Sequence, residues 1–156
     1  MRRYLSILSA ALIICSGTAF AAAGPQLPKG FTTWKKSERK VVTDKKSLFY
    51  GIHYIYADTK AFKGYQAGNK FPEGSRIVIE HFNIKDTPNG PTEGTKNMIV
   101  LMQKDKKRTS TGGWLYAGFT SQGKPSGLDP VKNCFECHQK EAAGRDYVFS
   151  GINDFK

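Results

Sequence analysis

The sequence predicts an α+β fold, in which an antiparallel β-sheet is flanked by short helices. Four segments rich in aromatic and β-branched residues have the character of strands. Short connections containing Gly, Pro, Asn and Asp separate most of these segments. Short segments with helix start and stop signals are inserted among the strands. Strands joined in this way, with helices between them, are typical of an antiparallel sheet in an α+β domain.

The first element is a predicted secretory signal peptide over residues 1–21. Arg2 and Arg3 form a basic start, and residues 4–15 are mostly apolar. Small residues follow, with Ala19-Phe20-Ala21 as the expected cleavage signal. A membrane anchor would need roughly 18 uninterrupted apolar residues. We therefore expect a periplasmic or otherwise secreted protein.

The remaining chain divides into a lead-in over residues 22–47, with a short helix at 31–40, and a main domain over residues 48–156. A helix is expected after Asp58, which suits an N-cap, and Gly68 is its stop signal. Residues 86–95 read as a loop. The predicted strands cover residues 48–56, 75–84, 96–104 and 114–120, and a last short helix covers 139–143.

The chain is strongly basic. Its 24 Lys and Arg residues against 13 Asp and Glu give a formal net charge of +11, and loss of Arg2 and Arg3 with the signal peptide leaves +9. Export argues against a nucleic-acid partner, whereas an acidic redox partner protein or an anionic membrane surface stays open. The simpler interpretation is a solvated basic surface, so we assign these residues no site role.

Two cysteines remain after removal of Cys15 with the signal peptide. Cys134 and Cys137 are separated by two residues, and a disulfide across so short a gap would constrain the unfolded chain very little. His138 follows directly, which completes the Cys-x-x-Cys-His spacing of covalent haem attachment. The thiols of Cys134 and Cys137 would add across the haem vinyl groups, and His138 would be the proximal iron ligand. We therefore predict one covalent haem c.

Two other interpretations of the cysteine pair are weaker. A thioredoxin-like pair would need a βαβ setting, whereas Pro130 and a loop precede Cys134. A zinc site would need a fourth ligand, for which His53 and His81 are candidates. The late position of the motif is also informative, because 18 residues follow His138 and none is Met or His. A small electron carrier with a downstream Met ligand is excluded in its usual chain order.

Four segments, taken in order, resemble the cytochrome P-460 family, which includes the cytochromes c′-β. They are "FPEGSRIVIE" at 71–80, "GGWLYAGF" at 112–119, "CFECHQ" at 134–139 and "DYVFS" at 146–150. The resemblance extends from about residue 48 to residue 155. It implies an antiparallel sheet flanked by helices, with covalent haem on one face. It also implies a homodimer and a mainly five-coordinate iron.

The resemblance also implies two function classes. Some members oxidise hydroxylamine and carry a lysine bonded to the haem, whereas others bind nitric oxide or carbon monoxide. Lys63 and Lys70 are near the position of the linking lysine, but Gln66 and Ala67 align closest to it. This departure favours binding of nitric oxide or a similar small nitrogen oxide or gas at an open distal iron position, with redox turnover left open. Hydroxylamine or nitric oxide oxidation is the alternative, and electron transfer is the second.

Several residues are candidates for the distal side of a haem, although packing is the commoner role of such residues in strands. Glu80 could transfer protons if it were buried, but we expect a solvated carboxylate. Trp114, Tyr147 and Phe149 are expected to pack around the haem or core. The candidate distal ligands are His53, His81, Met98 and Met102, and the candidate aromatic caps are Phe49, Phe71 and Phe82.

Overall fold

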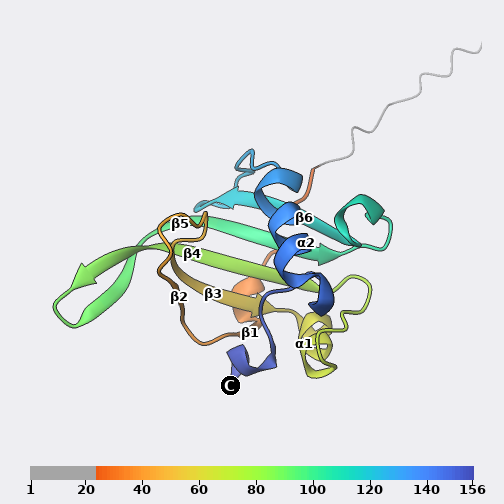
Figure 1. Cartoon of the computed structure of the whole chain (residues 1–156), viewed down its shortest axis with the longest axis horizontal. Coiled ribbons are helices and arrows are strands. Elements are labelled where there is room, and N and C mark those ends of the chain that lie inside the picture. Colours follow the sequence, from red (N-terminus) through yellow and green to blue (C-terminus); the bar gives the residue numbers. More distant parts are fainter. Residues whose placement is uncertain (1–23) are drawn as a thin grey trace, which may run out of the picture.

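The structure, a computed structural model, describes residues 24–156 and contains one antiparallel sheet with short helices (Figure 1). The strand order is β1-β3-β4-β5-β6, and β2 also pairs with β3. The predicted α+β fold with an antiparallel sheet is therefore confirmed. The predicted signal peptide lies outside the described residues. The strands are β1 (Lys35–Lys36), β2 (Lys40–Val42), β3 (Gly51–Ala57), β4 (Arg76–Thr87), β5 (Gly90–Lys104) and β6 (Trp114–Thr120), and the α-helices are α1 (Thr59–Gln66) and α2 (Glu136–Ala142).

Helix α1 begins and ends where its capping residues require. The Asp58 carboxylate accepts a hydrogen bond from the Ala61 backbone N–H at 2.8 Å, which satisfies one of the free donors of the first turn. Gly68, just past the last helical residue, has a φ of +72°, a conformation that glycine adopts without steric cost. The sequence predicted both the Asp58 cap and the Gly68 stop, and the structure confirms both.

The predicted helix at residues 31–40 is wrong. Only Phe31–Thr33 forms a helical turn, of the 3₁₀ type, and β1 and β2 follow it. Both short strands pair antiparallel with β3, and the Ser37 N–H donates to the Ile55 carbonyl at 2.8 Å. An exposed outer edge of β3 would leave its backbone groups unpaired, and this pairing outweighs a local helical preference.

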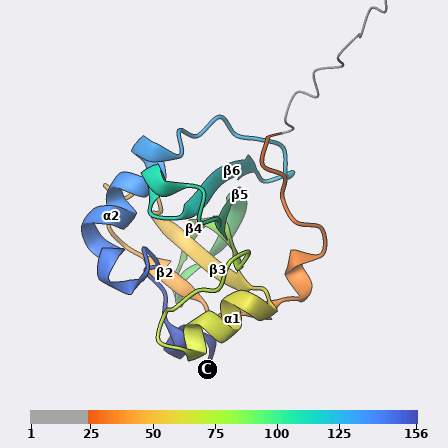
Figure 2. The same ribbon diagram turned by 90° about the vertical axis from the view of Figure 1, so that its right-hand side faces the viewer.

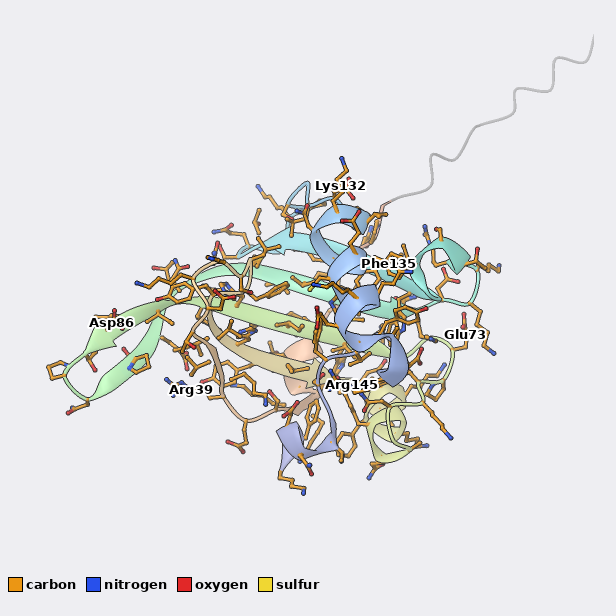
Figure 3. The ribbon with its side chains drawn as sticks, viewed as in Figure 1. Arg39, Glu73, Asp86, Lys132, Phe135 and Arg145 are labelled. Atoms are coloured by element: carbon orange, nitrogen blue, oxygen red, sulfur yellow. The ribbon has the colours of Figure 1, made fainter. Side chains whose placement is uncertain are left out.

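The predicted loop at residues 86–95 is also wrong. Strand β4 continues to Thr87 and β5 starts at Gly90, so that only Pro88 and Asn89 lie between the paired residues. A two-residue connection is the tightest that joins antiparallel strands, and Gly90 takes a φ of +101° beside it. The resulting hairpin, labelled at Asp86 in Figure 3, projects beyond the rest of the sheet.

The sheet separates two clusters of buried side chains. We call the side covered by α2 and the C-terminal segment the α2 face, and the side covered by the segment around Phe31 the N-terminal face (Figure 2). Because side chains alternate along a strand, Ile55 and Ile77 pack on the α2 face while Tyr56 and Val78 pack on the N-terminal face. No helix within residues 24–156 is long and apolar enough to span a membrane.

Candidate functional site

The Cys-x-x-Cys-His motif lies at the start of a helix packed against the α2 face. Cys134 is in a single π-helical turn, Val131–Phe135, that runs directly into α2, which carries Cys137 and His138. The exposed Asp129 begins this turn, because its carboxylate accepts hydrogen bonds from the N–H groups of Val131 at 2.8 Å and Lys132 at 3.0 Å. These backbone donors, that of Lys132 first, lower the pKa of Asp129.

The two cysteines are free thiols in different surroundings. The Cys134 side chain is buried within the core cluster of the α2 face, whereas Cys137 is exposed. Burial raises the pKa of the Cys134 thiol to about 11. A protonated, buried thiol is a poor nucleophile on its own, so Cys134 lacks the low pKa that marks the reactive cysteine of a thioredoxin-like redox site.

His138 has one ring nitrogen committed and one free for a ligand. Its Nδ1 lies 2.6 Å from the Tyr147 carbonyl oxygen. A carbonyl oxygen only accepts, so we assign the proton to Nδ1, which leaves the lone pair on Nε2. Burial lowers the pKa of His138, opposed by the bond to the Tyr147 carbonyl, and therefore favours the neutral ring. A neutral imidazole whose second nitrogen donates to a carbonyl is the usual form of a metal-binding histidine.

Aromatic rings enclose His138. The Phe149 ring centroid is 4.7 Å from that of His138, as expected for a residue predicted to pack around the site. The Tyr116 ring centroid is 5.1 Å away, and this residue was not singled out from the sequence. The Tyr116 hydroxyl is buried and has no hydrogen-bond partner. Burial accordingly raises the pKa of Tyr116 above its ordinary value.

The structure also brings two histidines together on the α2 face. His53 on β3 stands directly opposite His81 on β4, and their ring centroids are 5.5 Å apart. Phe49 stacks on His53 at 6.0 Å and meets His81 edge-on at 6.2 Å. His81 Nε2 lies 3.1 Å from the Tyr50 carbonyl oxygen, which fixes that ring. Sequence reasoning treated these residues singly, because neither the pairing register nor the fold of Phe49 over it is visible in the sequence.

This histidine pair has unused hydrogen-bonding capacity. His53 Nε2 and His81 Nδ1 are both buried without a partner. Burial, then His81, then Lys40 lower the pKa of His53 to about 4, and burial lowers the pKa of His81. Buried polar atoms in folded proteins are nearly always hydrogen-bonded, so two neighbouring exceptions are unusual.

The other distal candidates divide between the two faces. Met98 opposes His81 and Met102 opposes Tyr116, so both methionines lie on the α2 face. Phe82 packs on Tyr54, away from the histidine pair. Phe71 packs in the core against Tyr65 and Trp114. Among the three predicted aromatic caps, Phe49 alone contacts the histidine pair.

Glu80 differs from its predicted environment. It is only 5% exposed, so the expected solvated carboxylate is wrong. Its oxygens accept hydrogen bonds from the Tyr56 hydroxyl at 2.8 Å and from Lys96 Nζ at 2.5 Å. Tyr56 belongs to the cluster on the N-terminal face, so the sheet separates Glu80 from His138. Glu80 is therefore not placed to exchange protons at the His138 site.

The candidate linking lysines are exposed, as expected for lysines without a structural role. Lys63 lies near the end of α1, and Lys70 follows Asn69 after the helix. Gln66 and Ala67, which align closest to the linking position, are exposed as well.

Trp114 and Tyr147 pack in the core around the motif. Trp114 is fully buried and donates its Nε1–H to the Asp146 carbonyl at 2.9 Å. The Tyr147 ring packs against Phe135 at 5.7 Å. Sequence reasoning missed the role of the Tyr147 carbonyl, since a backbone acceptor carries no side-chain signal.

The described part of the chain contains no set of ligands for a zinc site. Residues 24–156 contain no group of three or more His, Cys, Asp or Glu side chains placed to hold a metal ion. His53 and His81 therefore do not join the cysteines as the zinc alternative required.

The sequence was compared with known families and proteins. The family described as Cytochrome P460 matches residues 28–150, which is most of the chain. No curated protein matches. The family implies a haem cofactor, which agrees with a histidine whose Nε2 is free beside two unpaired thiols. The chain therefore belongs to the cytochrome P460 family.

Proposed function

We propose that the chain is an exported, mono-haem c-type cytochrome that binds nitric oxide, or a similar small nitrogen oxide or diatomic gas, at an open iron position. The observation that carries this proposal is the 2.6 Å contact between His138 Nδ1 and the Tyr147 carbonyl, next to two free thiols in a member of this family. His138 would bind the iron through Nε2, and Cys134 and Cys137 would hold the haem covalently.

The placement of these three residues suits that role. The helical turn that holds Cys134 continues without a break into α2, which holds Cys137. Because the two cysteines are three positions apart, their side chains are neighbours on one face of this helix. Cys134 would hold the group from the buried side of this helix, and Cys137 from its exposed side. When bound, a haem would supply an iron atom with a coordination position for a small ligand.

The histidine pair shares the α2 face with His138 but stands apart from it. Tyr116, which contacts His138, aligns through Met102 and Ile77 with Ala57 of β3. His53 is four residues from Ala57 along β3, about 13 Å at the usual rise of a strand. His138 and the histidine pair thus lie toward opposite ends of the same face, and Phe49 shields the pair from water.

A second candidate function is electron transfer. In that case a second side chain would bind the iron on the side opposite His138. A six-coordinate iron of that kind would have no position for added nitric oxide. The two functions therefore differ in a single measurable property, the occupancy of the sixth position.

The experiment uses the protein exported by a host that attaches haem c. We expect the denatured protein to keep one haem by intact mass, and the absorption spectrum of the reduced protein to change on adding nitric oxide. A low-spin spectrum unaltered by nitric oxide contradicts gas binding. A haem-bearing peptide also tethered through Lys63 or Lys70 would instead support hydroxylamine oxidation.

A further inference from the structure

The turn that follows α2 holds the strongest backbone irregularity in the described chain. Within residues 24–156, three non-glycine residues have a positive φ: Asn69 at 63°, Asp146 at 50° and Tyr147 at 60°. Asn69 also contacts this region, since its side chain donates to the Ser150 carbonyl at 2.8 Å. A left-handed conformation is unfavourable for residues with a side chain, and for a bulky tyrosine above all. Such conformations persist only where their surroundings impose them.

The left-handed turn is held in place through hydrogen bonds to Asp146. Lys104 Nζ at the end of β5 lies 2.5 Å from its Oδ1, and the Phe71 N–H donates to its Oδ2 at 3.3 Å. Trp114 at the start of β6 donates to its carbonyl oxygen at 2.9 Å. Asp146 is therefore held by the paired ends of β5 and β6 and by the segment at Phe71, and it directly follows Arg145 at the end of the α2 region (Figure 3).

The neighbouring Tyr147 is held just as closely. A Cβ atom at Gly112 would lie 2.5 Å from the Tyr147 ring, so the ring packs against bare backbone. The Tyr147 N–H donates to the Ala142 carbonyl at 2.9 Å, which ties the turn to the helix that carries His138. The result of this bracing is the position of the Tyr147 carbonyl oxygen, 2.6 Å from His138 Nδ1.

We propose that Asp146 is a positioning residue for the proximal ligand: with Lys104 and Trp114 it holds the Tyr147 carbonyl against His138 and so sets the donor strength of that imidazole. This inference rests on the proposed haem at His138. A hydrogen-bond acceptor on Nδ1 makes a ligating imidazole more basic. A more basic imidazole stabilises oxidised iron over reduced iron and lowers the reduction potential. A loosened turn should therefore raise the potential.

The test compares two substitutions in the haem-loaded protein, Asp146→Asn and Lys104→Met. If both loosen the turn, both raise the reduction potential, and the iron–histidine stretching band of the reduced protein moves to lower frequency. A direct effect of charge predicts opposite signs, because losing a negative charge raises the potential and losing a positive charge lowers it. Lys104→Met is the decisive variant. A lowered potential with an unmoved stretching band overturns the proposal.

Trp114→Phe gives a second test that changes no charge. It removes the Nε1–H that donates to the Asp146 carbonyl and keeps a large aromatic ring in the core, so we expect a raised potential here also. An unchanged potential and stretching band in folded Trp114→Phe contradicts the role of this bond.

The control is Asp154→Asn, which breaks an ion pair to Lys40 with the same 2.5 Å separation, in another part of the fold. The stretching band should be unmoved in this variant, and an equal shift there counts against a specific role for Asp146. Failure of the proposed function is seen separately, as absence of covalent haem in the unsubstituted protein by intact mass.

Discussion

Both faces of the sheet bury polar side chains, but the two faces differ in whether these side chains have hydrogen-bond partners. On the N-terminal face, Glu80 is paired with both Tyr56 and Lys96. On the α2 face, the three buried side-chain atoms without a partner in residues 24–156 belong to His53, His81 and Tyr116. A buried polar group without a partner costs free energy, whereas a paired one contributes about 1 kcal/mol to stability. Within the described residues, the unmet hydrogen-bonding capacity of buried side chains is therefore confined to the α2 face.

The largest effect is expected from removing the two thiols on the α2 face, because this tests whether that face binds haem. We expect the double substitution Cys134→Ala with Cys137→Ala to abolish covalent haem, and each single substitution to weaken its retention, because each thiol would form one of two bonds. Haem that survives denaturation and acid extraction is measured by haem staining and intact mass. Full retention of covalent haem in both single variants would refute the attachment sites.

A smaller effect is expected from the pH dependence of stability. The pKa of His53 is about 4 in the folded chain and near 6.5 when unfolded, since burial disfavours the charged ring. Between these values the unfolded state binds more protons, so acidification through this window costs stability, and the loss levels off below about pH 4. His53→Phe should reduce the fall in urea midpoint between about pH 7 and about pH 5.

His81 faces His53 and also titrates with a lowered pKa, so part of the pH dependence should remain in His53→Phe. An unchanged pH dependence in this variant would mean that His53 is not buried in its neutral form. Lys40, the third contributor to the lowered pKa, provides a milder comparison through Lys40→Met.

The smallest expected effect compares one tyrosine from each face. Tyr56→Phe removes a hydroxyl bonded to Glu80 and should cost about 1 kcal/mol of unfolding free energy, the usual size for one hydrogen bond. Tyr116→Phe removes a buried hydroxyl without a protein partner together with its desolvation cost, so we expect no loss and a small gain of unfolding free energy in the same urea measurement. An equal loss in both variants would show that the Tyr116 hydroxyl is bonded, and the contrast between the faces would fail.

Much of the fold was predictable because its signals are local. The strand at 114–120 agrees with β6, and the Asp58 cap and Gly68 stop bound α1 as expected. Local signals failed where pairing partners decided the outcome. The segment at 31–40 became two strands because β3 offered unpaired backbone groups, and 86–95 became a hairpin because β4 and β5 continue their ladder past the body of the sheet.

The sequence by itself determined the candidate haem-attachment motif, because Cys134, Cys137 and His138 are neighbours in the chain and their spacing is that of the motif. Tertiary structure alone decided what surrounds that motif. It placed Glu80 on the far face, opposed His53 to His81, and brought the Tyr147 carbonyl to His138. Those relations depend on strand register and on a left-handed turn held by other parts of the fold, and neither is written in any local run of residues.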